Sequence, residues 1–129
     1  MPVPGRPKRK QSRAIGSVGV EERERRLGRN EALFREVNER IERVSGALRT
    51  GTDTMTILCE CGNPDCVEHI EVSLSKYERV RAESTHFFVR PGHAKPDVEE
   101  VIEHHDEYDV VRKNGLAGEI ARELDPRDD

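Results

Sequence analysis

The chain has 129 residues, which suits one compact domain with an appendage and excludes two large domains. Only 33% of the residues are hydrophobic, 37% are charged and none is Trp, so the hydrophobic core must be small. We therefore expect a disulfide, a metal or a partner chain to stabilise it. The formal net charge of -4 conceals an uneven distribution of charge along the chain.

Residues 1–20 are basic, and we expect them to form a disordered tail. Their basic side chains are Arg6, Lys8, Arg9, Lys10 and Arg13, and they include no acid. As an alternative, residues 6–13 could bind nucleic acid through its phosphates. From Thr50 onward nineteen acidic residues oppose nine basic ones, so this half is not expected to bind nucleic acid by itself.

The start of the chain, MPVPGRPKRK, lacks the apolar run of a secretory signal, and no stretch of 18 apolar residues occurs. The three cysteines are an odd number within eight positions, which does not suit a disulfide framework. We expect a cytoplasmic protein that does not enter the membrane.

Residues 21–49 are predicted to form a long amphipathic helix, because this segment is rich in Glu, Arg, Leu and Ala and contains no Pro. Its apolar residues are spaced alternately by three and four, as in a coiled-coil seam. The seam consists of Leu27, Asn30, Phe34, Val37, Ile41, Val44 and Leu48, and the polar Asn30 interrupts it where an apolar residue is expected. Such a helix is about 40 Å long, so part of it is expected to project or to contact a partner.

Two interpretations of this seam remain open. A buried Asn30 could fix the register of a self-dimer or of a complex with another protein. Alternatively, residues 34–48 pack on the protein's own domain while Asn30 faces water. Leu33 beside Phe34 widens the apolar face, which slightly favours packing on a sheet.

Residues 50–124 are predicted to form a small α+β domain, followed by a polar tail over 125–129. Strands are expected at residues 55–59, 68–74, 86–90 and 108–113, where β-branched and aromatic residues gather. Helices are expected to begin at Ser75 and Asp97, each of which matches a capping box, with the second helix reaching about His105. A weak helix is expected over residues 116–124.

The cluster CECGNPDC at residues 59–66 predicts a metal site. Thiolates are soft ligands, and a tight turn can aim Cys59, Cys61 and Cys66 at one tetrahedral ion, most simply zinc. The surrounding residues are polar or turn-forming, which argues against reduced cysteines that merely fill a core.

Two histidines compete to be the fourth ligand. His69 lies close in sequence, whereas His93 follows a distant Pro-Gly turn and would tie two β segments together. The spacing alone does not separate them. His104 and His105 are expected to be exposed on the helix predicted after Asp97.

The chain resembles a group of small uncharacterised bacterial proteins over about residues 21–127. The matching segments are RNEALFREVNERI (29–41), CECGNPDC (59–66), YERVR (77–81), FVRPGH (88–93) and VVRK (110–113). The resemblance implies that His93 is the fourth ligand and that the block with Asn30 and Asn38 makes a specific contact. It implies no reaction.

The favoured function is a non-catalytic zinc module that acts, in a regulatory role, through protein–protein contacts of its long helix. We do not expect an enzyme. Glu60 or Glu68 could serve as a base, but three thiolate ligands would make zinc a weaker Lewis acid. The alternatives are a nucleic-acid-associated accessory protein and a thiol redox sensor, in which Cys66 pairs with Cys59 or Cys61.

Overall fold

A computed structural model describes the backbone of residues 13–48 and 54–127 and the side chains of residues 21–44 and 54–127. The fold is α+β, as the sequence predicts. In chain order the elements are α1 (Arg13–Leu48), β1 (Thr54–Leu58), β2 (His69–Ser73), α2 (Leu74–Arg81), β3 (His86–Val89), β4 (Glu99–His104), β5 (Asp109–Lys113) and α3 (Gly115–Glu123).

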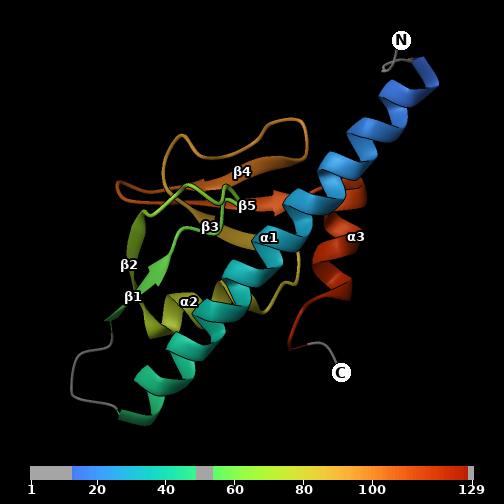
Figure 1. Cartoon of the computed structure of the whole chain (residues 1–129). Helices are drawn as coiled ribbons and strands as arrows, with labels where there is room; N and C mark the ends of the chain where they lie inside the picture. The colour runs from blue at the N-terminus through green and yellow to red at the C-terminus, as the bar shows by residue number, and fades with distance from the viewer. Residues whose placement is uncertain (1–12, 49–53, 128–129) are drawn as a thin grey trace.

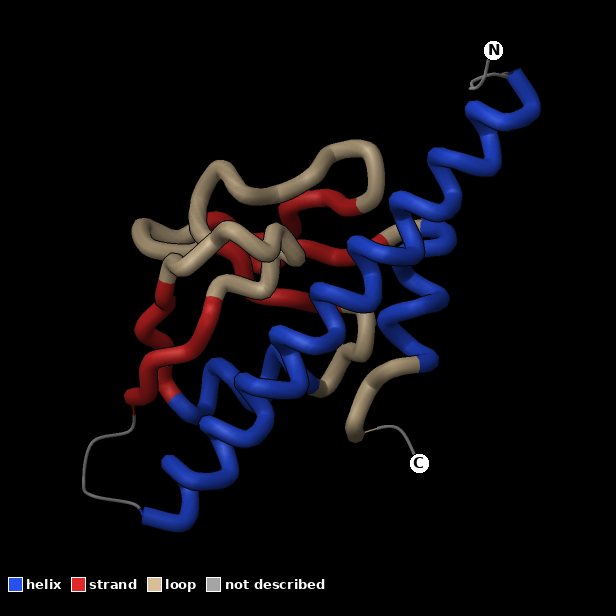
Figure 2. Tube along the Cα trace, in the orientation of Figure 1, coloured by secondary structure: helices blue, strands red, loops and turns tan. Residues whose placement is uncertain are grey.

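The strands form two small antiparallel sheets, one with the order β1-β2 and one with the order β3-β5-β4. A backbone bond from Glu60 N to Phe88 O (2.8 Å) connects the end of β1 to β3. Helix α1 runs diagonally along the molecule and contacts β1 and α3, and its N-terminal turns extend past the rest of the molecule (Figure 1). Figure 2 shows the long loops that leave β1 and β3 lying close together.

The hydrophobic core lies between the sheets and the helices and is as small as the composition requires. Buried and exposed side chains alternate along β1 and β2, so one face of each strand lies in the core. Ile57 and Ile70 on this face are almost fully inaccessible to solvent. Tyr77 of α2 stacks on Phe88 of β3 with ring centroids 5.7 Å apart. The core thus joins both sheets to α2.

The inner face of α1 is polar, which the predicted seam did not indicate. The residues buried on it are Gly28, Glu31, Ala32, Arg35, Asn38 and Glu39. The seam lies beside this face: Leu27, Phe34 and Val37 are half-buried, and Ile41 packs against the core. Val44 is 59% exposed and Leu33 54% exposed, while the side chain of Leu48 lies outside the described residues.

Buried charges on α1 are paired with groups of the domain. Arg35 donates to the carbonyl oxygens of Ser84 (2.6 Å) and Ala121 (2.8 Å), and its guanidinium lies over the ring of Phe87. Glu39 accepts hydrogen bonds from Tyr77 Oη (2.6 Å) and Arg81 Nε (3.2 Å). An unpaired buried charge is costly, so these contacts of the inner face favour one position of α1 on the domain.

The predicted polar tail over 125–129 begins too early. Asp125 is 9% exposed and accepts a bond from Arg81 at 2.7 Å. Arg127 forms ion pairs with Glu39 and Glu78. The segment up to Arg127 is therefore part of the folded unit, held by charges that sequence periodicity does not reveal.

The helix predicted over 97–105 is wrong, because residues 99–104 form strand β4. The segment pairs with β5 in an antiparallel ladder that contains an irregularity between Val101 and Glu103. This irregularity interrupts the alternation of side chains along the strand. The apolar residues of the segment are then spaced as they would be in a helix. The cap of α2 also differs: Ser73 rather than Ser75 accepts the bond from Lys76 N (3.1 Å).

Helix α1 begins at Arg13 rather than Glu21. The expected tail over 1–20 therefore overlaps the helix, and residues 1–12 lie outside the described part of the chain. None of the described helices has the length and apolar character needed to cross a membrane.

A buried triad links α1 to the second sheet. Lys113 of β5 forms ion pairs with Glu31 of α1 and Glu99 of β4, and all three side chains are at most 2% exposed. Burial raises the pKa of Glu31 to about 7, outweighing the attraction of Lys113 that lowers it. The carboxyl group of Glu31 thus retains a proton more readily than an exposed carboxyl group would.

The triad predicts a stability change with pH. The pKa of Glu31 rises from about 4.5 unfolded to about 7 folded, so its stabilising contribution is present below pH 4.5 and is lost as the pH passes about 7. Relative to Glu31→Gln at equal metal content, the wild type should lose on the order of 1–3 kcal/mol of unfolding free energy between pH 5 and pH 8. Urea unfolding at each pH measures this.

The matched control is Glu36→Gln, an exposed carboxylate on the same helix. This variant should keep the pH profile of the wild type. If the Glu31→Gln and wild-type profiles run parallel from pH 5 to pH 8, the proposed proton linkage at Glu31 is wrong.

Candidate metal centre

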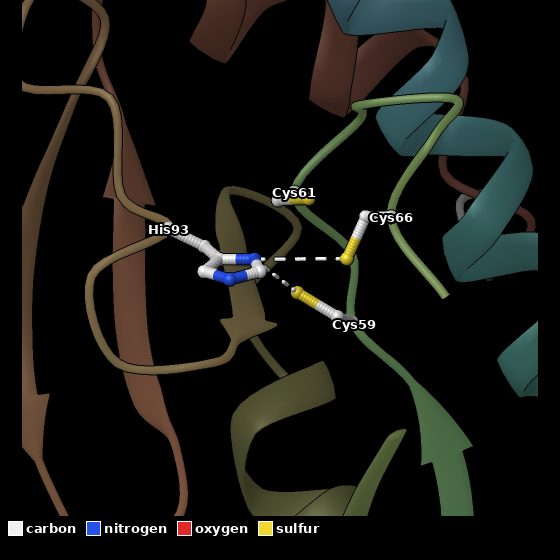
Figure 3. A group of neighbouring side chains, drawn as sticks. All are labelled: Cys59, Cys61, Cys66 and His93. Carbon is white, nitrogen blue, oxygen red and sulfur yellow. Dashed lines mark hydrogen bonds between the residues drawn. The ribbon is translucent and has the colours of Figure 1, made fainter. Parts of the chain in front are cut away.

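Cys59, Cys61, Cys66 and His93 converge on one point. Their nearest ligand atoms all lie within 4.8 Å of one another, and no other such group occurs among the described residues. Figure 3 shows the cysteines on one loop and the His93 ring entering from another, with the sulfurs of Cys59 and Cys66 directed at the ring. The four side chains lie close enough to hold a metal ion.

The distances fit a tetrahedral ion bound by thiolate and imidazole. His93 Nδ1 lies 3.5 Å from Cys59 Sγ and 3.6 Å from Cys66 Sγ. With zinc bonds of about 2.3 Å to sulfur and about 2.0 Å to nitrogen, tetrahedral geometry places sulfur and nitrogen about 3.5 Å apart. The donor set also matches the Cys₃His class of structural zinc sites.

The cysteines lie on residues 59–66, which we call the knuckle and which connects β1 to β2. Its turn is closed by a bond from Cys66 N to Asn63 O (3.0 Å), and Asn63 Oδ1 accepts from Asp65 N (2.9 Å). Gly62 has a φ of +83°, a conformation that glycine adopts without strain. These local features explain why CECGNPDC folds as a turn that gathers its thiols.

His93 comes from the turn that follows β3. The bond from His93 N to Arg90 O (3.0 Å) closes this turn, and Gly92 has a φ of +87°. Arg90 N donates to Cys59 Sγ at 3.2 Å, so the same segment supplies a ligand and supports another. An ion at this centre would join the β1–β2 loop to the β3–β4 loop.

Helix α1 and Lys95 support the knuckle from outside. Asn30 Nδ2 donates to Gly62 O (3.2 Å), and Lys95 Nζ donates to Cys61 O (2.6 Å). Asn30 therefore does not simply face water. Its contact within the same chain accounts for it without a dimer. Sequence reasoning noticed Asn30 as an interruption of the seam but not its contact with the knuckle.

Asn38 and Glu60 connect the knuckle to β1 and β3. Asn38 donates to Leu58 O (2.9 Å) and accepts from Leu58 N (2.8 Å), so its amide acts as a strand partner for β1. Glu60 is fully buried and accepts from Asn38 Nδ2 (2.7 Å) and Phe88 N (2.9 Å). Burial raises the pKa of Glu60.

The other residues considered for the site lie elsewhere. His69 is exposed at the start of β2, paired with Leu58, and is not among the four converging side chains. Glu68, considered as a base, is more than half exposed and lies 3.7 Å from Arg90. His104 and His105 are on or beside β4, where they contact Asp109 and Glu103.

The thiols of Cys59 and Cys61 interact with one another. A hydrogen bond from Cys59 lowers the pKa of Cys61, and the same bond raises the pKa of Cys59. Burial opposes the ionisation of both thiols. Metal binding requires thiolates, so it must release protons and should weaken at acidic pH.

The metal centre predicts a loss of bound zinc on removing any of its four ligands but not on removing His69. Protein purified without added metal should contain about one zinc per chain, since four donors fill a tetrahedral shell. Cys66→Ser and His93→Ala should lower that content at least tenfold. Elemental analysis with a protein assay gives the ratio.

His69→Ala is the matched control, because it removes an exposed imidazole near the knuckle. It should retain the wild-type zinc content. Iron in place of zinc, or loss of metal in His69→Ala alone, would contradict the assignment.

Comparisons with protein-family models, curated proteins and solved structures find no match to this chain. The resemblance to a group of small bacterial proteins consequently stays a prediction.

Proposed function

We propose that this chain is a non-catalytic zinc module that acts through protein–protein contacts of α1, in a regulatory role. The observation that carries the proposal is the complete set of four protein donors at the centre. A catalytic zinc keeps one position open for water, whereas a site filled by Cys₃His is of the structural type. The ion would stabilise a fold whose hydrophobic core is small.

The surroundings of the centre also favour a structural role. Both carboxylate oxygens of Glu60 are engaged by Asn38 and by Phe88 N, so this residue is poorly placed to act as a base. Glu68 is exposed and close to Arg90. Three thiolate ligands would in addition reduce the acidity of a metal-bound water.

The exposed part of α1 is the proposed interaction surface. Leu33 and Val44 leave more than half of their surface to solvent, and Val37 is half-buried between them. The partner would be a second copy or another protein. Thiolate ligands persist in a reducing compartment, which is why we propose a cytoplasmic location.

Two other functions remain proposals with narrower support. The basic residues in 6–13 would suit nucleic acid, although residues 1–12 lie outside the described structure. The proximity of the three sulfurs would suit a redox sensor that releases its metal when Cys66 forms a disulfide with Cys59 or Cys61.

The interaction proposal predicts that Leu33→Glu combined with Val44→Glu disrupts assembly without unfolding the protein. Both positions are exposed on α1, so the added charges should remain hydrated while an apolar interface is lost. For a self-dimer, light scattering after size exclusion should show the mass falling by half. For a different partner, the crosslinked product that the wild type forms with that partner should be lost in the double variant.

Arg43→Glu is the control, since it adds an acid at an exposed position of α1 without removing apolar surface. It should assemble as the wild type does. A monomeric wild type whose crosslinks are unchanged by the double substitution would refute this use of α1.

A further inference from the structure

A groove of about 870 Å³ lies between the N-terminal half of α1 and the knuckle. The helix forms one wall with Arg23, Arg26 and Arg29. Knuckle residues 62–64 and the loop around Lys95 form the opposite wall. Its volume falls within the usual range for ligand-binding clefts.

The α1 wall of this groove is positively charged on a chain whose net charge is -4. Among the side chains that the structure describes, Arg26 and Arg29 face only Glu22 in ion-pair range, at 3.9 and 3.8 Å, and more than half of each side chain is exposed. Such long, exposed pairs contribute little and leave the guanidinium groups available to another anion. The acids among the lining residues are Glu24 and Asp97, against four basic side chains that include Lys95.

The groove also has an apolar part. Leu27, half-buried, and Val98, 4% exposed, line it together with Pro64. No aromatic side chain is among the lining residues, whereas sites for single-stranded nucleic acid generally stack bases on aromatic rings. A basic wall beside aliphatic side chains matches a ligand with carboxylates and an apolar group.

We propose that this groove binds an acidic peptide segment of a partner protein, anchored by an apolar side chain near Leu27 and Val98. The proposal rests on the function proposed above, and it adds a second contact site on α1 together with the chemistry of the partner segment that binds there. The peptide's carboxylates would pair with Arg23, Arg26 and Arg29. This is a different part of α1 from the exposed Leu33 and Val44.

The metal centre and the groove share structural elements. Gly62 and Asn63 line the groove and belong to the segment that carries the cysteines. Asn30 Nδ2 connects α1 to Gly62 O, and Lys95 Nζ connects the opposite loop to Cys61 O. An ion at the centre would hold this wall in place, so peptide binding should depend on zinc.

The test begins with the full, zinc-loaded chain and a phage library of random 12-residue peptides. Selected peptides should be enriched in Asp and Glu and should contain an apolar residue. The most enriched peptide, synthesised with a fluorescent label, is then titrated by anisotropy. Arg26→Glu combined with Arg29→Glu should weaken its affinity at least tenfold, and zinc chelation should do the same.

Arg40→Glu combined with Arg43→Glu is the matched control, with the same charge change at exposed positions of the same helix. Its affinity should stay within twofold of the wild type. Circular dichroism checks that both variants retain the wild-type helix content, so that a lost affinity reports on the groove.

Selected peptides without acidic enrichment, or with equal affinity for the groove variant and the control, would overturn the proposal. If binding is instead lost in the Leu33→Glu and Val44→Glu variant, the groove fails while the function of α1 stands. If peptide binding is affected neither by the groove variant nor by the Leu33→Glu and Val44→Glu variant, the groove proposal and the proposed function of α1 are both wrong. A labelled oligonucleotide that binds in place of acidic peptides and is lost in the groove variant would overturn the peptide assignment.

Discussion

The close approach of α1 to the knuckle at Gly62 is the constraint on which the rest of the structure depends. A Cβ added at this residue would lie 2.6 Å from Glu31 Cγ and 2.7 Å from Leu27 Cδ1, both side chains of α1. Together with a φ of +83°, this leaves room for glycine alone. The contact lets one turn gather the thiols while Asn30 binds its backbone, so the helix and the metal centre are positioned together.

Polar contacts rather than apolar area determine how α1 lies on the domain. Its buried face presents Glu31, Arg35, Asn38 and Glu39, and each of them bonds to specific groups on the strands, α2, α3 or the loops, although Arg35 Nε has no partner among the described residues. Apolar packing tolerates small shifts, whereas buried charges and amides lose their partners when a helix slides. A chain with few hydrophobic residues can in this way specify one arrangement. A metal joining the loops after β1 and β3 would add a further connection between the sheets.

This arrangement separates two surfaces of α1. Near the knuckle, basic residues and Leu27 border a groove, while farther along Leu33 and Val44 face solvent. The charged inner face lies between α1 and the domain and is unavailable to partners. A partner of α1 would thus meet a surface whose position depends on the buried ion pairs and, on one side, on the knuckle.

The sequence by itself determined the α+β class, the long helix, the turn in the cysteine cluster and most strands, because these follow from local periodicity and turn residues. Spacing left His69 and His93 open, and only the tertiary structure placed the His93 ring beside the sulfurs. Residues 99–104 were mistaken for a helix because an irregular strand shifts the alternation of its side chains. The inner face of α1 was also missed, since Glu31, Arg35 and Glu39 have the composition of a solvated surface. Their burial depends on partners such as Lys113 and Arg81, which lie far away in sequence and meet them only in the folded chain.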